Sequence, residues 1–235
     1  MKFSLARPAV ALAVLATLAA CGGGGKATFP INITVSGLQY PGLVLSTNGQ
    51  DLPINPPATA GQDVTAVFPN QIEYGQVYEV IPKGAVVTNH TPVGGTQPKH
   101  QQCAASPYLP YGTAGQLARI DIRFVCAINT YPLGGTVKGL TGTGLVLANG
   151  STTGTIGVSP ALDANQKPTG ADVALIMNSV PYNTTYGVTV LTQPTSPAQT
   201  CTVTGGANGS GGGTMDDAAE AAGGVGNLVV TCVNN

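Results

Sequence analysis

The internal repeat of this chain constrains its fold more than any other feature. Residues 35–38 (Val-Ser-Gly-Leu) recur as Val-Lys-Gly-Leu at 137–140, and residues 42–45 (Gly-Leu-Val-Leu) recur unchanged at 144–147. Further matches follow in the same order: Asp63 with Asp172, Tyr74 with Tyr182, Tyr78 with Tyr186, Gln97 with Gln193, Cys103 with Cys201, and Cys126 with Cys232. Ordered matches over most of the chain predict two copies of one structural unit of about 100 residues, a usual size for a small domain.

Each copy has the hydrophobic pattern of β-strands. Apolar and polar residues alternate over residues 31–36, 64–68, 120–124, 173–177 and 186–190, as they do in strands that bury one face. The 33 glycines and 18 prolines are typical of short strands joined by many turns. Trp is absent, so we expect cores built mainly from Val, Ile, Leu and Ala.

The number and spacing of these runs indicate the fold class. We expect about seven short strands in each copy, and seven strands in about 100 residues fit a two-sheet sandwich of the immunoglobulin type. The sequence therefore predicts an all-β protein with two tandem immunoglobulin-like β-sandwich domains, the first over residues 29–128 and the second over residues 129–235.

The cysteines divide evenly between the two copies if one of them has a separate role. Of the five cysteines, Cys21 precedes the repeat, and the other four formally allow three disulfide pairings. Repeat symmetry favours Cys103 with Cys126 and Cys201 with Cys232. In the second copy the two cysteines would face each other across a hairpin. On the chain-entropy model, a bridge that closes a few tens of residues contributes about 3 kcal/mol.

The first 20 residues have the anatomy of an export signal. Lys2 and Arg7 provide a positively charged start, and residues 9–20 form an uncharged apolar run. This run is too short to span a bilayer, which needs roughly 20 apolar residues. Cleavage of an ordinary secretory signal after Ala20 is one interpretation. A cysteine directly after the small residues favours a different one.

Residues 18–21 (Leu-Ala-Ala-Cys) resemble the lipobox of bacterial lipoproteins. The resemblance implies that residues 1–20 are removed, that Cys21 receives diacylglycerol on its thiol and an acyl chain on its amine, and that residues 21–28 form a glycine-rich tether. More than one acyl chain gives stable membrane anchoring. In this family an aspartate after the cysteine favours the inner membrane; Gly22 stands there instead, which implies the outer membrane.

The repeated unit resembles immunoglobulin-like repeats that occur in tandem in exported and surface proteins of Gram-negative bacteria. The resemblance rests on residues 144–147, on Tyr-Gly-Val-Thr-Val at 186–190, and on the Gln-Pro at 193–194 that precedes Cys201. The first copy is more divergent, because residues 78–82 (Tyr-Glu-Val-Ile-Pro) end the corresponding strand early. The resemblance implies a fold but little about activity, since such modules serve as spacers, adhesive units and accessory domains.

The composition argues against several classes of function. Charged residues make up 8% of the chain, with nine Lys and Arg against ten Asp and Glu, so no basic surface for nucleic acid is expected. His90 and His100 are the only histidines, and no nucleophile motif accompanies them. We expect both to be solvated loop residues, and we expect no catalytic residue and no cofactor. An enzyme of unfamiliar type that uses one of the two histidines is the remaining alternative.

An acidic cluster lies in a glycine-rich insertion of the second copy, residues 205–224. Asp216, Asp217 and Glu220 provide oxygen ligands of the kind that Ca²⁺ prefers, but their spacing matches no EF-hand and no other calcium motif. We therefore expect a solvated hairpin tip and no metal. Whether this loop binds an ion is left open by the sequence.

One loop of the first copy carries apolar residues without a counterpart in the second. Tyr108, Leu109 and Tyr111 lie in a proline-containing stretch, residues 106–115. Packing against a neighbouring loop is one interpretation, and a contact patch for a partner is the other.

Together these patterns predict a non-enzymatic, lipid-anchored envelope protein at the outer membrane. Its domains would act as a structural spacer or as a protein- or glycan-binding module, with residues 86–99, 106–115 and 205–224 as the candidate contact loops. An accessory subunit of an envelope secretion or surface-assembly system is the alternative. The membrane, reached through the acyl chains, is the one partner that the sequence itself indicates.

Substitution of Cys21→Ser tests the anchor. The variant lacks the thiol that accepts diacylglycerol, so we expect it to be released in soluble form or to accumulate as the uncleaved precursor. Fractionation of cells followed by immunoblotting measures this. Unchanged recovery in the membrane fraction would contradict the lipoprotein interpretation.

Overall fold

The computed structural model describes residues 26–107, 109–150 and 154–235. Over these residues the protein is all-β, with 55% of the chain in strands and 3% in helix. The export signal, Cys21 and the start of the tether lie outside the described residues. Among the described helices, none has the length and apolar character needed to cross a membrane.

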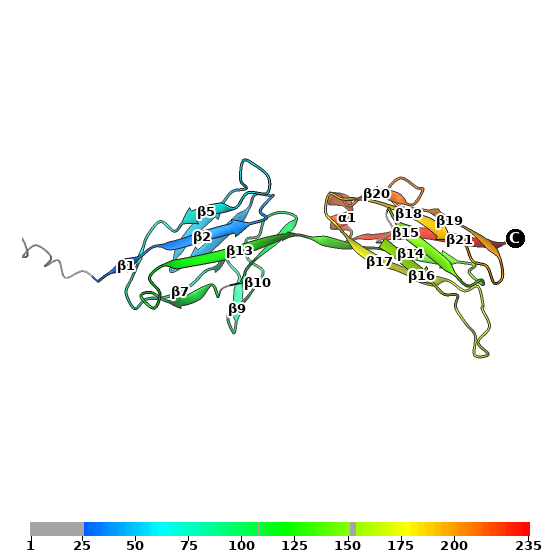
Figure 1. Ribbon diagram of the computed structural model, residues 1–235, viewed down its shortest axis with the longest axis horizontal. Coiled ribbons are helices and arrows are strands. Elements are labelled where there is room, and N and C mark those ends of the chain that lie inside the picture. The colour runs from blue at the N-terminus through cyan, green and yellow to red at the C-terminus, as the bar shows by residue number, and fades with distance from the viewer. Residues whose placement is uncertain (1–25, 108, 151–153) are drawn as a thin grey trace, which may run out of the picture.

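The strands fall into two halves that meet at Asn129 (Figure 1). The strands of the first half are β1 (Thr28–Phe29), β2 (Ile31–Ser36), β3 (Leu43–Thr47), β4 (Gln50–Ile54), β5 (Val64–Val67), β6 (Ile72–Glu73), β7 (Val77–Glu79), β8 (Ile81–Pro82), β9 (Val86–Thr88), β10 (Thr91–Val93), β11 (Gln101–Ala105), β12 (Tyr111–Thr113) and β13 (Ile120–Ile128). The elements of the second half are β14 (Thr130–Lys138), β15 (Leu145–Asn149), β16 (Thr155–Val158), β17 (Val173–Pro181), β18 (Thr185–Thr192), β19 (Gln199–Thr204), β20 (Gly212–Thr214), α1 (Asp217–Ala221) and β21 (Val225–Asn234).

The two halves have the same sheet order. One sheet of the first half runs β11-β13-β2-β5, and the corresponding sheet of the second half runs β19-β21-β14-β17. In both, the first long strand pairs in parallel with the last one, β2 with β13 and β14 with β21. The internal repeat of the sequence is therefore also a repeat of strand topology.

The opposing sheets correspond as well, with one interruption. The second half has a continuous sheet of order β16-β15-β18-β20. In the first half β3 pairs with β4 and β8, whereas β12 pairs with β7. Only Val80 separates β7 from β8, so the single strand β18 is represented here by two short strands. This is the early strand break that residues 78–82 predict.

The strand order differs from that of a constant-type immunoglobulin domain. There the first, second, fifth and fourth strands share one sheet, and the third, sixth and seventh share the other. Here the first long strand, β2, pairs with the last strand, β13, and β3 pairs with β4. Alternating hydrophobicity reveals which face of a strand is buried, but it does not reveal which strand lies beside it.

Each half has its own hydrophobic core. The buried residues between Ile31 and Cys126 form one cluster, and those between Leu133 and Cys232 form another. Along β2 and β13 every second residue is buried, so the predicted alternation corresponds to the core face of these strands. The aliphatic side chains expected from the composition make up most of both clusters.

A disulfide lies at the same place in each core. Cys103 on β11 bonds to Cys126 on β13, and Cys201 on β19 bonds to Cys232 on β21. In each hairpin the two cysteines are directly opposite in the strand register. These are the pairs that repeat symmetry favours, and each closes the hairpin formed by the last two long strands of its half.

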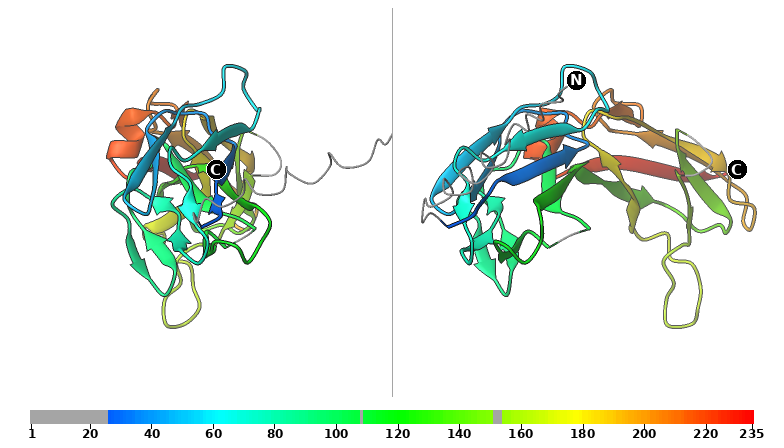
Figure 2. Two further views of the ribbon diagram at one scale, coloured as in Figure 1. Left: turned by 90° about the vertical axis from the view of Figure 1, so that its left-hand side faces the viewer. Right: turned by 60° about the vertical axis from the view of Figure 1, so that its left-hand side comes forward.

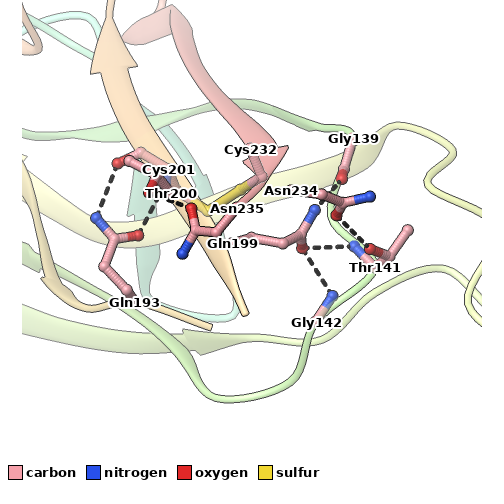
Figure 3. The surroundings of a disulfide bond; sticks show 10 residues. All are labelled: Gly139, Thr141, Gly142, Gln193, Gln199, Thr200, Cys201, Cys232, Asn234 and Asn235. Carbon is pink, nitrogen blue, oxygen red and sulfur yellow. Dashed lines mark hydrogen bonds between the residues drawn. A yellow bond between two sulfur atoms is a disulfide. The ribbon is translucent and has the colours of Figure 1, made fainter. Parts of the chain in front are cut away.

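A buried glutamine accompanies each disulfide. In Figure 3 the Gln199 side chain accepts hydrogen bonds from the backbone N–H groups of Thr141 and Gly142, at 2.9 and 2.7 Å. Its amide nitrogen donates to the carbonyl of Gly139 at 2.8 Å. Gln101 makes the same three bonds in the first half, to Gln39, Tyr40 and Gly37. In each half, the glutamine therefore connects the turn that follows the first long strand with the hairpin that carries the disulfide.

Replacement of Gln199→Ala should destabilise the second half. Two backbone N–H groups and one carbonyl lose their partner, and a buried polar group without a partner costs about 1–3 kcal/mol. We expect the free energy of unfolding to fall by about 3 kcal/mol. The loss is no larger because water in the vacated space forms hydrogen bonds with some of these backbone groups. Urea titration followed by circular dichroism measures this. Thr202→Ala, at an exposed position of the same strand, is the control; equal stability of the two variants would contradict the role of Gln199.

Candidate functional site at the junction of the two halves

A single residue connects the two halves. β13 ends at Ile128 and β14 begins at Thr130, so Asn129 alone forms the connection. Its backbone N–H donates to the carbonyl of His100 at 2.9 Å, and its carbonyl accepts from the N–H of Tyr182 at 2.9 Å. The connection is therefore bonded to a loop of each half. The halves lie end to end in Figure 1, and one lies in front of the other when viewed along the long axis (Figure 2, left).

The imidazole of His100 lies at the centre of this junction. Its side chain is only 4% exposed. Nδ1 lies 2.5 Å from Oε2 of Glu220, and Nε2 lies 3.4 Å from Oδ1 of Asp217. Both carboxylates come from helix α1 of the second half. The two ring nitrogens of one residue thus each face a carboxylate of the other half.

Aromatic rings surround this imidazole. The ring of Tyr182 is stacked on His100 with the centroids 3.5 Å apart and the planes at 4°. Tyr40 meets both rings edge-on, at 5.1 Å from His100 and 5.8 Å from Tyr182. Stacked and edge-to-face arrangements are the favourable ones for aromatic rings. They also exclude water from the imidazole, which strengthens its electrostatic contacts.

Further polar groups complete the bonding of the two carboxylates. Asp217 accepts from the Tyr182 hydroxyl at 2.7 Å and from the Lys99 ammonium at 3.1 Å. Glu220 accepts from the hydroxyl of Tyr131. We call these seven residues the junction cluster: Tyr40, Lys99, His100, Tyr131, Tyr182, Asp217 and Glu220. It takes three residues from the first half and four from the second.

The hydrogen bonds of the cluster shift the pKa values of its members. The bond from the Tyr182 hydroxyl, followed by that from Lys99, holds the pKa of Asp217 below its ordinary value. The same bond raises the pKa of Tyr182 to about 12, because an ionised Asp217 disfavours a second negative charge. Burial, followed by the bond to Glu220, raises the pKa of Tyr131. The tyrosines therefore remain neutral donors, and Asp217 remains an ionised acceptor, over the physiological pH range.

A short helix positions the two carboxylates. The side chain of Asp216 caps α1 by accepting from the backbone N–H groups of Ala218 and Ala219, at 3.1 and 3.0 Å. Aspartate is among the preferred N-cap residues. Asp217 and Glu220 are three residues apart, so they lie on neighbouring positions of one helix face. The cap sets the direction of that face, and the face is directed at the first half.

Two expectations from the sequence are wrong here. His100 is a buried contact residue instead of a solvated loop histidine. The acidic segment is a short helix instead of a hairpin tip, and although Asp217 remains 64% exposed as expected, both Asp217 and Glu220 contact the first half. The helix-forming residues around them are the one local signal that indicates an ordered segment. The repeat analysis assigns each residue to a half, but it contains no information about which surfaces of the two halves meet.

The cluster is bonded without a metal ion. The ligand-type atoms of His100, Asp217 and Glu220 lie within 4.8 Å of one another. However, each carboxylate already faces a nitrogen of the imidazole. The Lys99 ammonium already bonds to Asp217. The arrangement is that of an ion-pair and hydrogen-bond network.

The other histidine belongs to a shallow groove of the first half. His90 is half exposed, lies 2.9 Å from Glu79 through Nδ1, and stacks on Tyr111 with the centroids 3.8 Å apart. The groove has a volume of about 530 Å³ and is lined by Asn48, Val77, Tyr78, Glu79, His90, Tyr111, Gly112 and Thr113. The amide of Asn48 donates to the carbonyl of Val77. The polar side chains at its ends thus already bond within the first half.

The apolar loop of the first half is divided between packing and exposure. Tyr111 is half-buried on β12 and packs on His90. Leu109 is 64% exposed. Tyr108 lies outside the described residues. Of the repeated tyrosines, Tyr186 is buried and its hydroxyl accepts from the N–H of Ala207 at 3.0 Å.

Comparison of the chain with protein-family models, with curated proteins and with solved structures found no match in any of the three.

Substitution of Asp217→Asn tests the electrostatics of the cluster. Because the bond to Asp217 is the largest cause of the raised pKa of Tyr182, that pKa should fall from about 12 toward the ordinary value of 10.0. NMR titration of ring-labelled tyrosines measures it. Asp216→Asn, which removes a neighbouring charge but retains a capping side chain, is the matched control. A Tyr182 pKa that responds equally to both variants would contradict the direct bond.

Proposed function

We propose that this protein is a lipid-anchored spacer of the bacterial cell envelope. Its two tandem immunoglobulin-like sandwiches, residues 29–128 and 129–235, are held end to end as one stiff unit at the outer membrane. The observation that carries the proposal is the junction cluster. A connection of one residue, bonded to both halves, is braced by a buried imidazole with a carboxylate on each nitrogen.

The junction differs from the linker of a protein whose domains move freely. Flexible linkers are several residues long and rich in Gly and Ser, whereas Asn129 is alone and its N–H and carbonyl are both bonded. Bending at this point would separate His100 from Tyr182 and pull the carboxylates of α1 away from the first half. Leaving a buried charge without its partner is strongly unfavourable. These contacts support a fixed arrangement of the halves.

The position of the chain ends supports a spacer that projects from a membrane. β1 lies at one end of the long axis and the C-terminus lies at the other (Figure 1). An anchor at Cys21 precedes β1 by a few residues of tether, so the second half would be the part most distant from the lipid. Acyl chains at a single residue attach the protein without any spanning segment.

The immunoglobulin-like character of the halves is part of the proposal. Two packed sheets of mostly antiparallel short strands and about 100 residues per unit are features of that class. The disulfides here join neighbouring strands of one sheet, whereas the immunoglobulin disulfide joins the two sheets. The parallel pairing of first and last strand would make these modules a variant of it. This pairing brings the chain into and out of each module along one sheet, β2 beside β13 and β14 beside β21, which suits a linear array.

A role as a binding module, or as an accessory subunit of an envelope machine, has weaker support. Leu109 and the groove beside Tyr111 are the surface where a protein or glycan would bind. Crosslinking and pull-down from intact cells, with the lipid anchor present, discriminates the two functions. A partner whose recovery is lost in Leu109→Asp indicates a binding module. Recovery that is independent of Leu109 agrees with a spacer. The nearly neutral charge gives nucleic acid no favourable surface.

A non-enzymatic role is supported by the way the histidines are bonded. His100 has both ring nitrogens directed at carboxylates within the junction. His90 is exposed and pairs with Glu79. If either histidine supported an activity, a variant with both replaced by alanine would lose it; a spacer predicts that any assayable activity of the preparation is unchanged.

Distance measurements across the junction test the spacer directly. Thr65 on β5 and Ala174 on β17 are exposed and occupy equivalent places in the two halves. Spin labels on Thr65→Cys and Ala174→Cys, in a chain carrying Cys21→Ser, should give one narrow distribution of distances. A short glycine insertion after Asn129 supplies the flexible control and should broaden it. Equally broad distributions for both proteins would show that the junction is not stiff.

A further inference from the structure

We propose that the junction is a proton-dependent latch: it holds the two halves together while the imidazole of His100 is protonated, and it loosens when that proton is lost. The inference rests on the proposed function, because it concerns the control of the stiffness that a spacer needs. It is carried by the geometry around one side chain.

The two ring nitrogens of His100 face two acceptor groups. Nδ1 of His100 faces Oε2 of Glu220 at 2.5 Å, and Nε2 faces Oδ1 of Asp217 at 3.4 Å. An ionised carboxylate only accepts hydrogen bonds, whereas a neutral imidazole has one donor and one acceptor nitrogen. The contact to Glu220 is a hydrogen bond, and the contact to Asp217 is at ion-pair distance; both are attractive together in the imidazolium, in which both nitrogens carry a proton. Loss of the proton turns one attractive contact into a lone pair that faces a negative oxygen.

The charges of the junction cluster balance when His100 is protonated. The protonated state has two positive groups, His100 and Lys99, and two negative groups, Asp217 and Glu220. The remaining members, Tyr40, Tyr131 and Tyr182, are neutral. Deprotonation of His100 leaves one unit of excess negative charge, with two carboxylates whose oxygens are within 4.8 Å of each other. Charges of one sign at this separation repel appreciably where water is partly excluded.

The electrostatic attraction in the junction cluster acts between the two halves. His100 and Lys99 belong to the first half, and both carboxylates belong to α1 of the second. The attraction therefore acts between the halves, and its loss weakens their contact without disturbing either core. His90 provides the contrast, because its pair with Glu79 lies within the first half. A change of charge at His90 therefore does not alter the attraction between the two halves.

Asp217 remains an ionised partner of the imidazole in mild acid. The Tyr182 hydroxyl and Lys99 hold the pKa of Asp217 below its ordinary value, so mild acid does not neutralise it. Histidine is the side chain that changes charge between about pH 5 and about pH 8. The contact between the halves is therefore attractive while the imidazole carries its proton, and it weakens when that proton is lost.

Distance distributions at two pH values test the latch. The doubly labelled protein, with Thr65→Cys and Ala174→Cys, is measured at about pH 5 and at about pH 8, the limits of histidine titration. We expect a narrow distribution in acid and a wider one at the higher pH. His100→Gln is the key variant, because its amide is uncharged and offers no titration; its distribution should be the same at both pH values. His90→Gln is the matched control and should behave as the parent protein does.

The outcomes separate the latch from the spacer. A narrow distribution at both pH values overturns the latch and leaves the spacer intact. A broad distribution at both overturns the spacer and the latch together. Persistence of the pH response in His100→Gln overturns the assignment to this residue. NMR of the labelled imidazole supplies a second readout. Its ring nitrogens should both carry protons when the distribution is narrow, and a neutral ring in that state contradicts the proposal.

Discussion

The placement of one imidazole between two carboxylates decides the arrangement of this molecule. His100 comes from the loop before β11, and its partners come from a helix that lies 120 residues further along the chain. This contact adds to the covalent connection at Asn129 and to the Lys99–Asp217 ion pair. With it, the rings of Tyr40 and Tyr182, the hydroxyl of Tyr131 and the ammonium of Lys99 all find partners in the same small volume. A buried charge is stable only where the groups around it neutralise it or form hydrogen bonds with it.

Each half depends on a second, simpler device that it has in duplicate. A core disulfide joins the last two long strands, and a buried glutamine two residues before the first cysteine bonds the turn that follows the first long strand, at the same end of the sheet. Gln101 and Gln199 make the same bonds in both copies. The glycines at which these turns begin, Gly37 and Gly139, have positive φ, and a side chain there would collide with the carbonyl of Cys126 or Cys232. The identical arrangement in two divergent copies indicates that the module requires it as a unit.

The fold could be predicted further than the site. Alternation along residues 31–36 and 120–124 identifies buried faces correctly, and the early end of the strand at 78–82 is visible in the letters. The role of the buried glutamines was not predicted, although the sequence contains a signal for it: a glutamine stands two residues before the first cysteine in both copies. The junction had no comparable signal. His100 and Glu220 have no counterparts in the other copy, and a repeat reports only what the copies share. The alternation of apolar and polar residues did not predict the order of the strands either, since a strand has the same alternation whichever strand lies beside it.

The sequence by itself determined the two-copy organisation, the all-β class, the faces that are buried and the cysteine pairs that symmetry favours. These are local or repeated properties, recorded in the spacing of residues along the chain. The tertiary structure alone decided that a histidine of one half meets the carboxylates of the other. It also decided that the segment expected to be a hairpin tip forms the helix α1, which contacts the first half. Such a contact depends on the relative position of two surfaces. That position follows from the length of the connection at Asn129 and from charges that are far apart in sequence, and no periodicity of the chain records it.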